Sequence, residues 1–300
     1  MKILKDIVKK IIFFPLIILN LIAELYSKLI SFIKPNLGNF WLDRLVEKNK
    51  NITQQVIHKL NDGKELKLKL FTPNWRCRYG AESFSKKEPE TLKWIDEYGG
   101  DGVLFDIGAN VGLYSLYYAA TKKSKVYAFE PSVFNLALLA KNIHINNLDH
   151  LIQIITNPLS KENQFANFSL SMDEEGGTMS AFGVEYGHDG KPMNKSLSYQ
   201  TLGFSLDFLI QNKILTEYPK MIKIDVDGIE HLILAGALET LKNPICKTVL
   251  IEVSYNFISQ SDGITKILTD CGFTTNQKLS DYVGKGDPSD SSFNQIWIKK

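Results

Sequence analysis

The chain has 300 residues, of which 44% are hydrophobic and 23% charged, so it can bury a sizeable core. This composition excludes an intrinsically disordered chain and a small scaffold held together by disulfide bonds. The formal net charge is +2, but residues 1–60 carry ten Lys or Arg against four Asp or Glu, which leaves about −4 for the remainder and argues against a nucleic-acid-binding body.

Residues 1–38 form a basic and apolar segment. Four lysines lie within the first ten residues, and an apolar run follows over residues 11–23. That run is shorter than the roughly 20 apolar residues of a membrane-spanning helix, and from Glu24 onward the apolar residues recur at helical spacing. We therefore predict a helix over residues 1–33 that lies on a membrane surface and is attracted to anionic head groups. The alternative is a helix that packs on the main domain.

Residues 39–100 precede the main domain and are predicted to form an accessory region. Residues 40–60 have the pattern of a helix, and Asn61-Asp62-Gly63 is typical of a turn. Residues 64–71 alternate charged and apolar side chains, as expected of a half-exposed strand.

Residues 101–300 show the alternation of a doubly wound α/β sheet. The predicted strands are residues 103–107, 125–129, 151–156, 221–225 and 248–253, and the predicted helices are residues 112–121, 132–146, 229–242 and 262–271. Strands that are separated by helices in this way pair in parallel. The last two predicted strands, residues 273–275 and 295–298, have no helix between them and indicate an antiparallel edge. The sequence therefore predicts a Rossmann-like, mostly parallel sheet with an antiparallel edge strand.

A long insertion separates the third and fourth predicted strands. Residues 160–205 lack clear periodicity and are rich in Gly, Ser and Asn. Long irregular segments within compact domains often carry function. We therefore predict that this insertion is a cover that faces the substrate.

The three cysteines, Cys77, Cys246 and Cys271, are widely spaced and form no C-x-x-C pattern. A secreted disulfide framework or a structural zinc site needs paired or clustered ligands. We predict reduced thiols in the core and no metal site.

The sharpest motif follows the first strand of the main domain. A buried strand over residues 103–107 runs into a turn that contains Gly108, Asn110 and Gly112, and then into a helix. Glycine in such a turn lets the backbone approach a ligand closely, because a Cβ atom would collide with it. An NAD-binding turn has the pattern G-x-G-x-x-G and seats a pyrophosphate, but Asn110 occupies the position of its middle glycine. The G-x-x-x-G spacing, with Asp106 just before it, suits a ligand without a pyrophosphate.

A carboxylate stands at the end of the second predicted strand. Glu130 lies about 20 residues beyond the turn, where an acid accepts hydrogen bonds from both hydroxyls of a ribose, and Pro131 begins the next helix. The carboxyl ends of parallel strands meet at one edge of the sheet, so we expect Asp106, Glu130, Asn157 and Asp225 to gather there. The turn and the acid indicate an adenosine-type ligand. Helix capping or a solvated strand end is the alternative for Asp106 and Glu130.

Several stretches together carry a resemblance to a known family. They are residues 87–92, 106–115, 128–135, 141–142 and 222–230, continuing into 234–237. Their order and spacing resemble the FkbM family of S-adenosylmethionine (SAM)-dependent methyltransferases over about residues 75–260. One departure is Asp227, where the family more often carries Glu. The resemblance implies a class I methyltransferase fold, SAM as cofactor, and methyl transfer to oxygen, frequently in gene contexts of polysaccharide or natural-product assembly.

On this basis the predicted cofactor-binding residues are Asp106, Gly108, Asn110, Gly112, Glu130, Pro131 and Asn157. SAM carries an activated methyl group, so positioning of the acceptor supplies much of the catalysis. A hydroxyl is still a poor nucleophile, and a carboxylate that accepts its proton would help. Asp225, Asp227 and Glu230 are the predicted catalytic residues, as proton acceptor or acceptor clamp, with turn formation and helix capping as alternatives. Metal-independent catalysis is favoured over a divalent cation held by these acids.

The predicted function is O-methylation of a glycan, a lipid-linked saccharide or a related small molecule. An NAD-dependent Rossmann oxidoreductase shares the strand, the turn and the acid, and is one alternative. A catalytically inactive scaffold recruited to a membrane is the other, because a fold alone does not prove activity. Since SAM is made in the cytoplasm, we predict a protein bound at the cytoplasmic face of a membrane, with no nucleic-acid partner and with its oligomeric state open.

Overall fold

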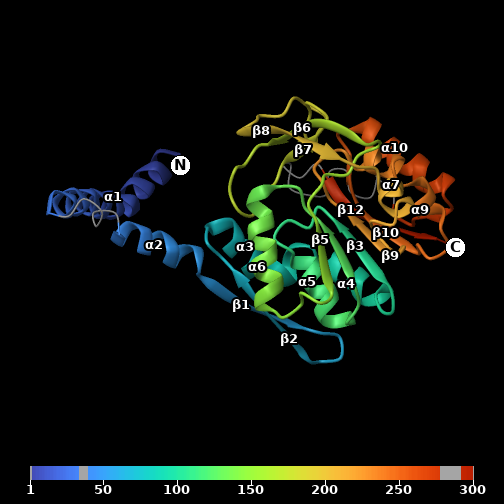
Figure 1. Ribbon diagram of the computed structural model, residues 1–300, viewed down its shortest axis with the longest axis horizontal. Coiled ribbons are helices and arrows are strands. Elements are labelled where there is room, and N and C mark those ends of the chain that lie inside the picture. The colour runs from blue at the N-terminus through green and yellow to red at the C-terminus, as the bar shows by residue number, and fades with distance from the viewer. Residues whose placement is uncertain (1, 34–39, 278–291, 300) are drawn as a thin grey trace. The chain divides into compact units, whose positions relative to one another are not determined.

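The computed structural model describes residues 2–33, 40–277 and 292–299 (Figure 1). The chain divides into two compact units, Met1–Ile52 and Thr53–Lys300. The first unit contains the helices α1 (Lys2–Ile33) and α2 (Phe40–Lys50), so the predicted N-terminal helix is confirmed. None of the helices within the described ranges combines the length and the apolar character that crossing a membrane requires.

The second unit is built on a sheet whose strand order is β11-β12-β10-β9-β3-β4-β5. The strands are β3 (Val103–Ile107), β4 (Val126–Phe129), β5 (Ile152–Ile155), β9 (Pro219–Ile224), β10 (Thr248–Ser254), β11 (Phe273–Thr274) and β12 (Ser292–Lys299). Neighbours from β10 to β5 pair in parallel, whereas β12 pairs antiparallel with both β10 and β11. The predicted mostly parallel sheet with an antiparallel edge is therefore confirmed.

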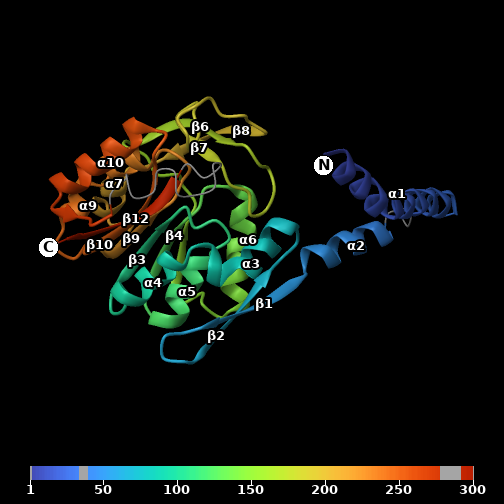
Figure 2. The same ribbon diagram turned by 180° about the vertical axis from the view of Figure 1, so that it is seen from behind.

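Helices cover both faces of this sheet (Figures 1 and 2). On one face lie α4 (Pro89–Tyr98), α5 (Leu113–Lys122) and α6 (Val133–Ile145), and on the other lie α7 (Leu206–Gln211), α8 (Glu230–Ala235), α9 (Leu238–Lys242) and α10 (Ile258–Asp270). Successive residues of β3 enter opposite cores: Leu104 packs in the cluster of Leu116, and Phe105 in the cluster of Ile233. Burial on both faces explains why the central strands are apolar without alternation.

A hairpin and a helix precede α4. The hairpin strands β1 (Thr53–Lys59) and β2 (Glu65–Phe71) pair antiparallel, and α3 (Trp75–Lys87) follows. The helix predicted over residues 40–60 is therefore wrong beyond Lys50. Val56 lies opposite Leu68 in the hairpin, and both side chains are buried in the cluster that contains Phe84. These partners are distant in sequence, so their packing overrides the local helical pattern.

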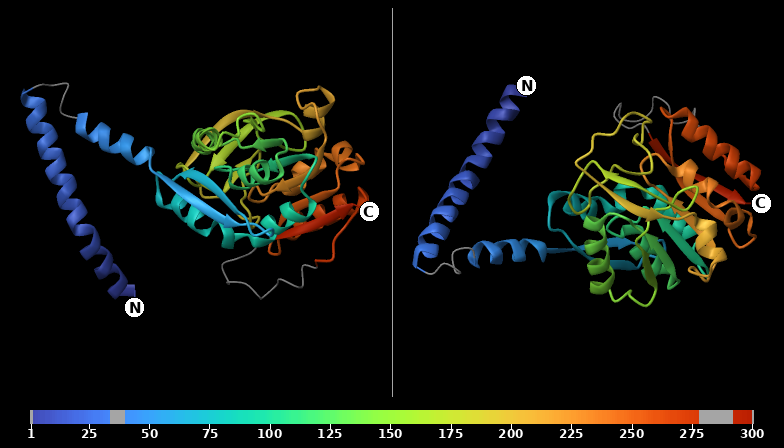
Figure 3. Two further views of the ribbon diagram at one scale, coloured as in Figure 1. Left: turned by 90° about the horizontal axis from the view of Figure 1, so that it is seen from below. Right: turned by 45° about the horizontal axis from the view of Figure 1, so that its top comes forward.

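The insertion forms a small antiparallel sheet with the strand order β7-β6-β8. Its strands are β6 (Gln164–Leu170), β7 (Ser180–Phe182) and β8 (Leu197–Gly203), coloured yellow-green and yellow in Figure 3. The sequence of β6 does not show the alternation of apolar and polar residues that is typical of a strand, because Phe165 is 74% exposed while Ser169 is fully buried. The Ser169 hydroxyl lies 3.1 Å from that of Ser198, which compensates its burial.

The helix predicted over residues 229–242 is two helices, α8 and α9, and that prediction is corrected here. The break falls at Gly236, where a Cβ atom would lie 2.3 Å from the carbonyl oxygen of Ser160. A continuous helix at this point would place side chains against the backbone that leads into the insertion. The turn between the helices allows that close approach.

Candidate functional site

A cavity of about 970 Å³ opens at the carboxyl ends of the parallel strands. Its walls come from the turns after β3, β4, β5 and β9, from the end of β10, from the start of β12, from α3 and the first turn of α4, and from the insertion. Ligands of open parallel sheets bind at this edge. The cavity is therefore the candidate site.

The turn after β3 has the backbone that its glycines allow. Gly108 has φ +83°, and a Cβ atom there would lie 1.9 Å from the carbonyl oxygen of Asp225. Gly112 has φ +92°, and its Cβ would lie 2.5 Å from the Leu139 side chain. Gly108 lines the cavity, whereas Gly112 packs behind it. The glycines are thus required first by close packing within the chain, which brings the turn against the end of β9.

Glu130 closes this turn at the end of β4. One carboxylate oxygen accepts a hydrogen bond from the Asn110 amide at 2.8 Å, and the other accepts one from the Ser132 amide, also at 2.8 Å. Burial raises the pKa of Glu130 to about 7, against the lowering effect of these hydrogen bonds. Glu130 and Pro131 both line the cavity. The acid is therefore held in one orientation at the predicted ribose position.

Asn157 and Asp106 take different places. Asn157 lines the cavity, and its side-chain amide donates to the carbonyl of Leu202 in β8 at 2.9 Å. Asp106 is 1% exposed and lies behind the turn, where one oxygen accepts a hydrogen bond from the Ser115 hydroxyl at 2.5 Å. Burial raises the pKa of Asp106, although Lys223 opposes that change. Asp106 is placed to hold the start of α5 against the turn.

Lys223 and Asp225 form an ion pair at the end of β9. The Lys223 side chain is 1% exposed, and its Nζ lies 2.8 Å from Asp225 Oδ2 and 5.2 Å from the centre of the Tyr114 ring. Burial alone would raise the pKa of Asp225, but the Lys223 ammonium outweighs it and the pKa is lowered. The signal for Lys223 in the sequence was a lysine within the apolar strand Pro219–Ile224, and sequence reasoning missed it.

Asp227 joins the turn after β9 to the insertion. Its Oδ2 accepts hydrogen bonds from the amides of Met179, at 2.8 Å, and Ser180, at 3.2 Å. Burial and the neighbouring Asp225 raise the pKa of Asp227 to about 6. The side chain lines the cavity, as does that of Asp225.

Glu230 lies behind this turn. It is completely buried, and its carboxylate accepts hydrogen bonds from the amides of Val226, at 3.2 Å, and Gly228, at 3.1 Å, and from the Gln260 side chain at 2.8 Å. Of the three carboxylates predicted as catalytic, the structure therefore places Asp225 and Asp227 at the cavity and Glu230 outside its lining.

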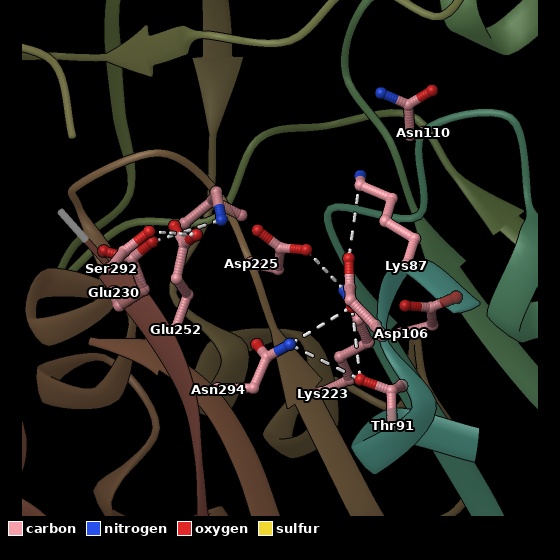
Figure 4. A network of polar contacts seen from close by, with 12 residues as sticks. Lys87, Thr91, Asp106, Asn110, Lys223, Asp225, Glu230, Glu252, Ser292 and Asn294 are labelled. Carbon is pink, nitrogen blue, oxygen red and sulfur yellow. Dashed lines mark hydrogen bonds and ion pairs between the residues drawn. The ribbon is translucent and has the colours of Figure 1, made fainter. Parts of the chain in front are cut away.

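Polar side chains from β10 and β12 also line the cavity near Asp225, and we call them, together with Asp225, the polar wall (Figure 4). Sequence reasoning missed the residues that these two strands contribute. Glu252, within β10, lines the cavity and accepts a hydrogen bond from the Ser292 hydroxyl at 2.7 Å. Asn294 donates to Glu88 at 3.2 Å and to Glu90 at 3.1 Å. Glu252 is an acid inside the apolar strand β10, as Lys223 is a base inside β9, so that signal was available. Asn294 had none, because its partners lie more than 200 residues away.

The insertion covers the turn after β3. The side-chain amides of Asn110 and Asn135 both donate to the carbonyl of Gly177, at 3.0 and 3.1 Å, and the Gly176 amide donates to Asn135 Oδ1 at 2.9 Å. Gly176 and Gly177 line the cavity. The insertion is therefore fastened to the turn after β3 and to α6 through Asn110 and Asn135, whereas its role as a cover that faces the substrate stays a prediction.

Cys77, Cys246 and Cys271 are free and buried, in agreement with the predicted reduced core thiols. Across the described ranges there is no group of three or more His, Cys, Asp or Glu side chains placed to hold a metal ion.

Comparison with known proteins assigns the family. Residues 106–275, more than half of the chain, match the family described as the methyltransferase FkbM domain. The methyltransferase FkbM of Methylobacillus flagellatus KT is 14% identical with a TM-score of 0.43, over 66% of this chain and 43% of that one. This chain thus spans less than half of that protein's length.

Two further solved structures match parts of the chain. The precorrin-6y C5,15-methyltransferase of Geobacter metallireducens GS-15 is 13% identical with a TM-score of 0.42, over 71% of this chain and 86% of that one. TYW2 of M. jannaschii, solved with AdoMet, is 12% identical with a TM-score of 0.38, over 82% of this chain and 87% of that one. No curated protein matches the chain. The family match, which agrees with the glycine turn and the acid after β4, shows that this chain belongs to the FkbM methyltransferase family, whose cofactor is SAM.

Proposed function

We propose that the protein transfers a methyl group from SAM to a hydroxyl oxygen of a glycan, a lipid-linked saccharide or a related polyhydroxy molecule. The observation that carries this proposal is the polar wall beside the cofactor turn. Asp225, Glu252, Ser292 and Asn294 line one side of the cavity with groups that both donate and accept hydrogen bonds. A polyhydroxy molecule offers the same mixture of donors and acceptors.

The other side of the cavity fits SAM. Gly108 presents backbone without a side chain, the Asn110 side-chain amide is bonded to Gly177, and Glu130 offers its carboxylate after β4 for the ribose hydroxyls. Pro131 and Asn157 also line this side of the cavity. The sulfonium of bound SAM supplies an activated methyl group. The carboxylates of the polar wall favour a cationic cofactor and disfavour the phosphates of a nucleic acid.

The predicted catalytic acids take separate roles in this proposal. Asp225, whose pKa is lowered beside Lys223, stays ionised and accepts a hydrogen bond from the acceptor hydroxyl, which orients it. Asp227 holds the insertion over the site through the Met179 and Ser180 amides. Glu230 stabilises the turn after β9 by accepting hydrogen bonds from the amides of Val226 and Gly228.

Calorimetry on the full-length protein tests the cofactor part. We expect binding of SAM but not of NAD, and weaker binding of SAM by a Glu130→Ala variant. Failure of a folded sample to bind SAM would refute the proposed function. Binding of NAD instead would revive the oxidoreductase alternative, against which the family assignment and Asn110 stand.

We also propose that residues 1–33 bind the cytoplasmic surface of a membrane. Apolar side chains of α1 are exposed, among them Leu25 at 67%, Leu29 at 62% and Phe32 at 91%. An amphipathic helix with lysines and exposed apolar residues binds anionic bilayers.

Flotation with phosphatidylglycerol vesicles should recover the wild-type protein, and phosphatidylcholine vesicles should recover less. A Leu25→Glu/Leu29→Glu variant should lose binding, whereas Ile214→Glu, at a residue 54% exposed in the second unit, should keep it. Equal recovery of all three proteins would contradict the proposal.

A further inference from the structure

Two carboxylates of the polar wall lie side by side on neighbouring strands. In the parallel pair of β9 and β10, Ile251 lies opposite Ile224. Asp225 directly follows the end of β9, whereas Glu252 stays within β10 and pairs with Asn294 of β12. Both are partly buried and both line the cavity. Figure 4 shows Glu252 beside Asp225, with Ser292 next to Glu252. An acceptor hydroxyl in this part of the cavity therefore meets both acids.

The two acids have opposite electrostatic surroundings. Asp225 is paired with the Lys223 ammonium at 2.8 Å. Glu252 faces carboxylates: burial raises its pKa well above the ordinary value, and the charges of Asp225, Glu230 and Asp227 raise it further. The Ser292 hydroxyl opposes this rise only in part.

A neutral side-chain amide, that of Gln260, also lies against Glu252. The side-chain amide of Gln260, in α10, donates to the Glu252 main-chain carbonyl at 3.2 Å and to Glu230 at 2.8 Å. On the carboxylate itself, Oε1 accepts the Ser292 hydroxyl, and within the described residues no hydrogen bond is made to Oε2. Ser292 thus fixes the orientation of the group and leaves one oxygen for a ligand.

Two acids with separated proton affinities can divide the work of one reaction. A carboxylate beside an ammonium holds protons weakly and suits a clamp that stays ionised. A carboxylate among other carboxylates holds protons more strongly, which makes it the better proton acceptor near neutral pH. The structure therefore distinguishes between Asp225 and Glu252.

We propose that Glu252 is a catalytic residue that accepts the proton of the acceptor hydroxyl, while Asp225 orients that hydroxyl. This inference rests on the proposed function. As the acceptor oxygen forms its bond to the methyl carbon, the methyl–sulfur bond breaks and its electron pair passes to sulfur. The hydroxyl proton passes to Glu252 Oε2, so the products are the methyl ether, neutral S-adenosylhomocysteine and a protonated carboxyl group.

The first test needs no acceptor. Full-length protein labelled with ¹³C at the glutamate side-chain carboxyl is titrated by NMR, and the Glu252 signal is identified by its loss in Glu252→Gln. We expect Glu252 to titrate well above the ordinary glutamate pKa of about 4.3, and higher still in Ser292→Ala, which lacks the hydrogen bond to the ionised form. An ordinary pKa would overturn the proposal.

The second test measures transfer of tritiated methyl groups from SAM to a pool of methyl glycosides of glucose, mannose, galactose, rhamnose, fucose and N-acetylglucosamine. Glu252→Gln should lower kcat by about 10²- to 10⁴-fold while the Kd for SAM stays within about twofold of wild type. Glu252→Asp should recover part of the activity, and Ser292→Ala should move the acidic limb of the pH profile upward. Glu162→Gln, at an exposed position, is the matched control.

The outcomes separate the two proposals. Wild-type kcat in Glu252→Gln, with an unchanged pH profile, would overturn the role of Glu252 and leave methyl transfer standing. A wild-type protein that binds SAM but methylates no glycoside would refute the proposed acceptor class, and the NMR titration would still decide the proton affinity of Glu252. Loss of SAM binding in the wild type would refute the proposed function itself.

Discussion

Replacement of Lys223 by Met probes the buried ion pair at the end of β9. The Lys223 side chain is 1% exposed and lies 2.8 Å from Asp225. Removal of one partner of a fully buried pair costs about 3–5 kcal/mol, because the remaining charge is left without compensation. The Asp225 side chain is 30% exposed, so water in the cavity compensates part of that charge. We therefore expect the free energy of unfolding to fall by about 2–3 kcal/mol.

The sign of the pH dependence follows from the lowered pKa of Asp225. An acid whose pKa is lower in the folded state contributes stability above its unfolded pKa of about 3.9 and loses it as the pH falls through the folded value. The difference in stability between wild type and Lys223→Met should therefore be complete at neutral pH. It should shrink as the pH falls below about 4.

Urea denaturation of wild type, Lys223→Met, Asp225→Asn and the double variant measures this coupling. Lys266→Met is the control, because its ion pair with Asp270 is as short, at 2.6 Å, but 77% and 62% exposed. We expect that control to lose much less stability than Lys223→Met, because water already solvates both of its charges. A loss in Lys223→Met no larger than in the control, or additive effects in the double variant, would refute the reasoning.

Glu130→Gln should bind SAM about tenfold or more weakly in calorimetry. Because burial raises the pKa of Glu130 to about 7, wild-type affinity should rise with pH through that value, and a flat profile would contradict the ribose contact. Gly108→Ala should lose SAM binding and about 2 kcal/mol or more of stability, because its Cβ would lie 1.9 Å from a carbonyl oxygen of the chain. Gly63→Ala, with φ +84° and nothing within 4 Å, should lose only about 1 kcal/mol in the same denaturation assay. Asn135→Ala removes contacts that fasten the cover, so hydrogen exchange in the covering segment should become about tenfold faster, and unchanged exchange would show that the cover is held elsewhere.

The fold and the cofactor side of the site followed from local patterns. An apolar run, a glycine turn and a helix form one local unit. The carboxyl ends of parallel strands lie at one edge of the sheet because of the direction of the backbone, whichever side chains the strands carry. Asn110, Glu130, Pro131 and Asn157 accordingly all line the cavity. The turn and the strand β2 of the hairpin were predicted, but β1 was predicted as a helix, because its local pattern does not show the packing of Val56 against Leu68 and Phe84.

The sequence by itself determined the succession of strands and helices in the main domain, the cofactor turn and the presence of acids beside it. The order of the strands in the sheet came from the structure. Only the tertiary structure decided which acids face the cavity. Asp227 and Glu230 follow the same strand, but Glu230 turns inward because turn amides and Gln260, from α10, satisfy its oxygens. Glu252 faces the cavity, held by Ser292, which lies near it on the antiparallel neighbour β12. The direction of a buried carboxylate is set by the donors that reach it, and here those donors come from elements that only folding brings together.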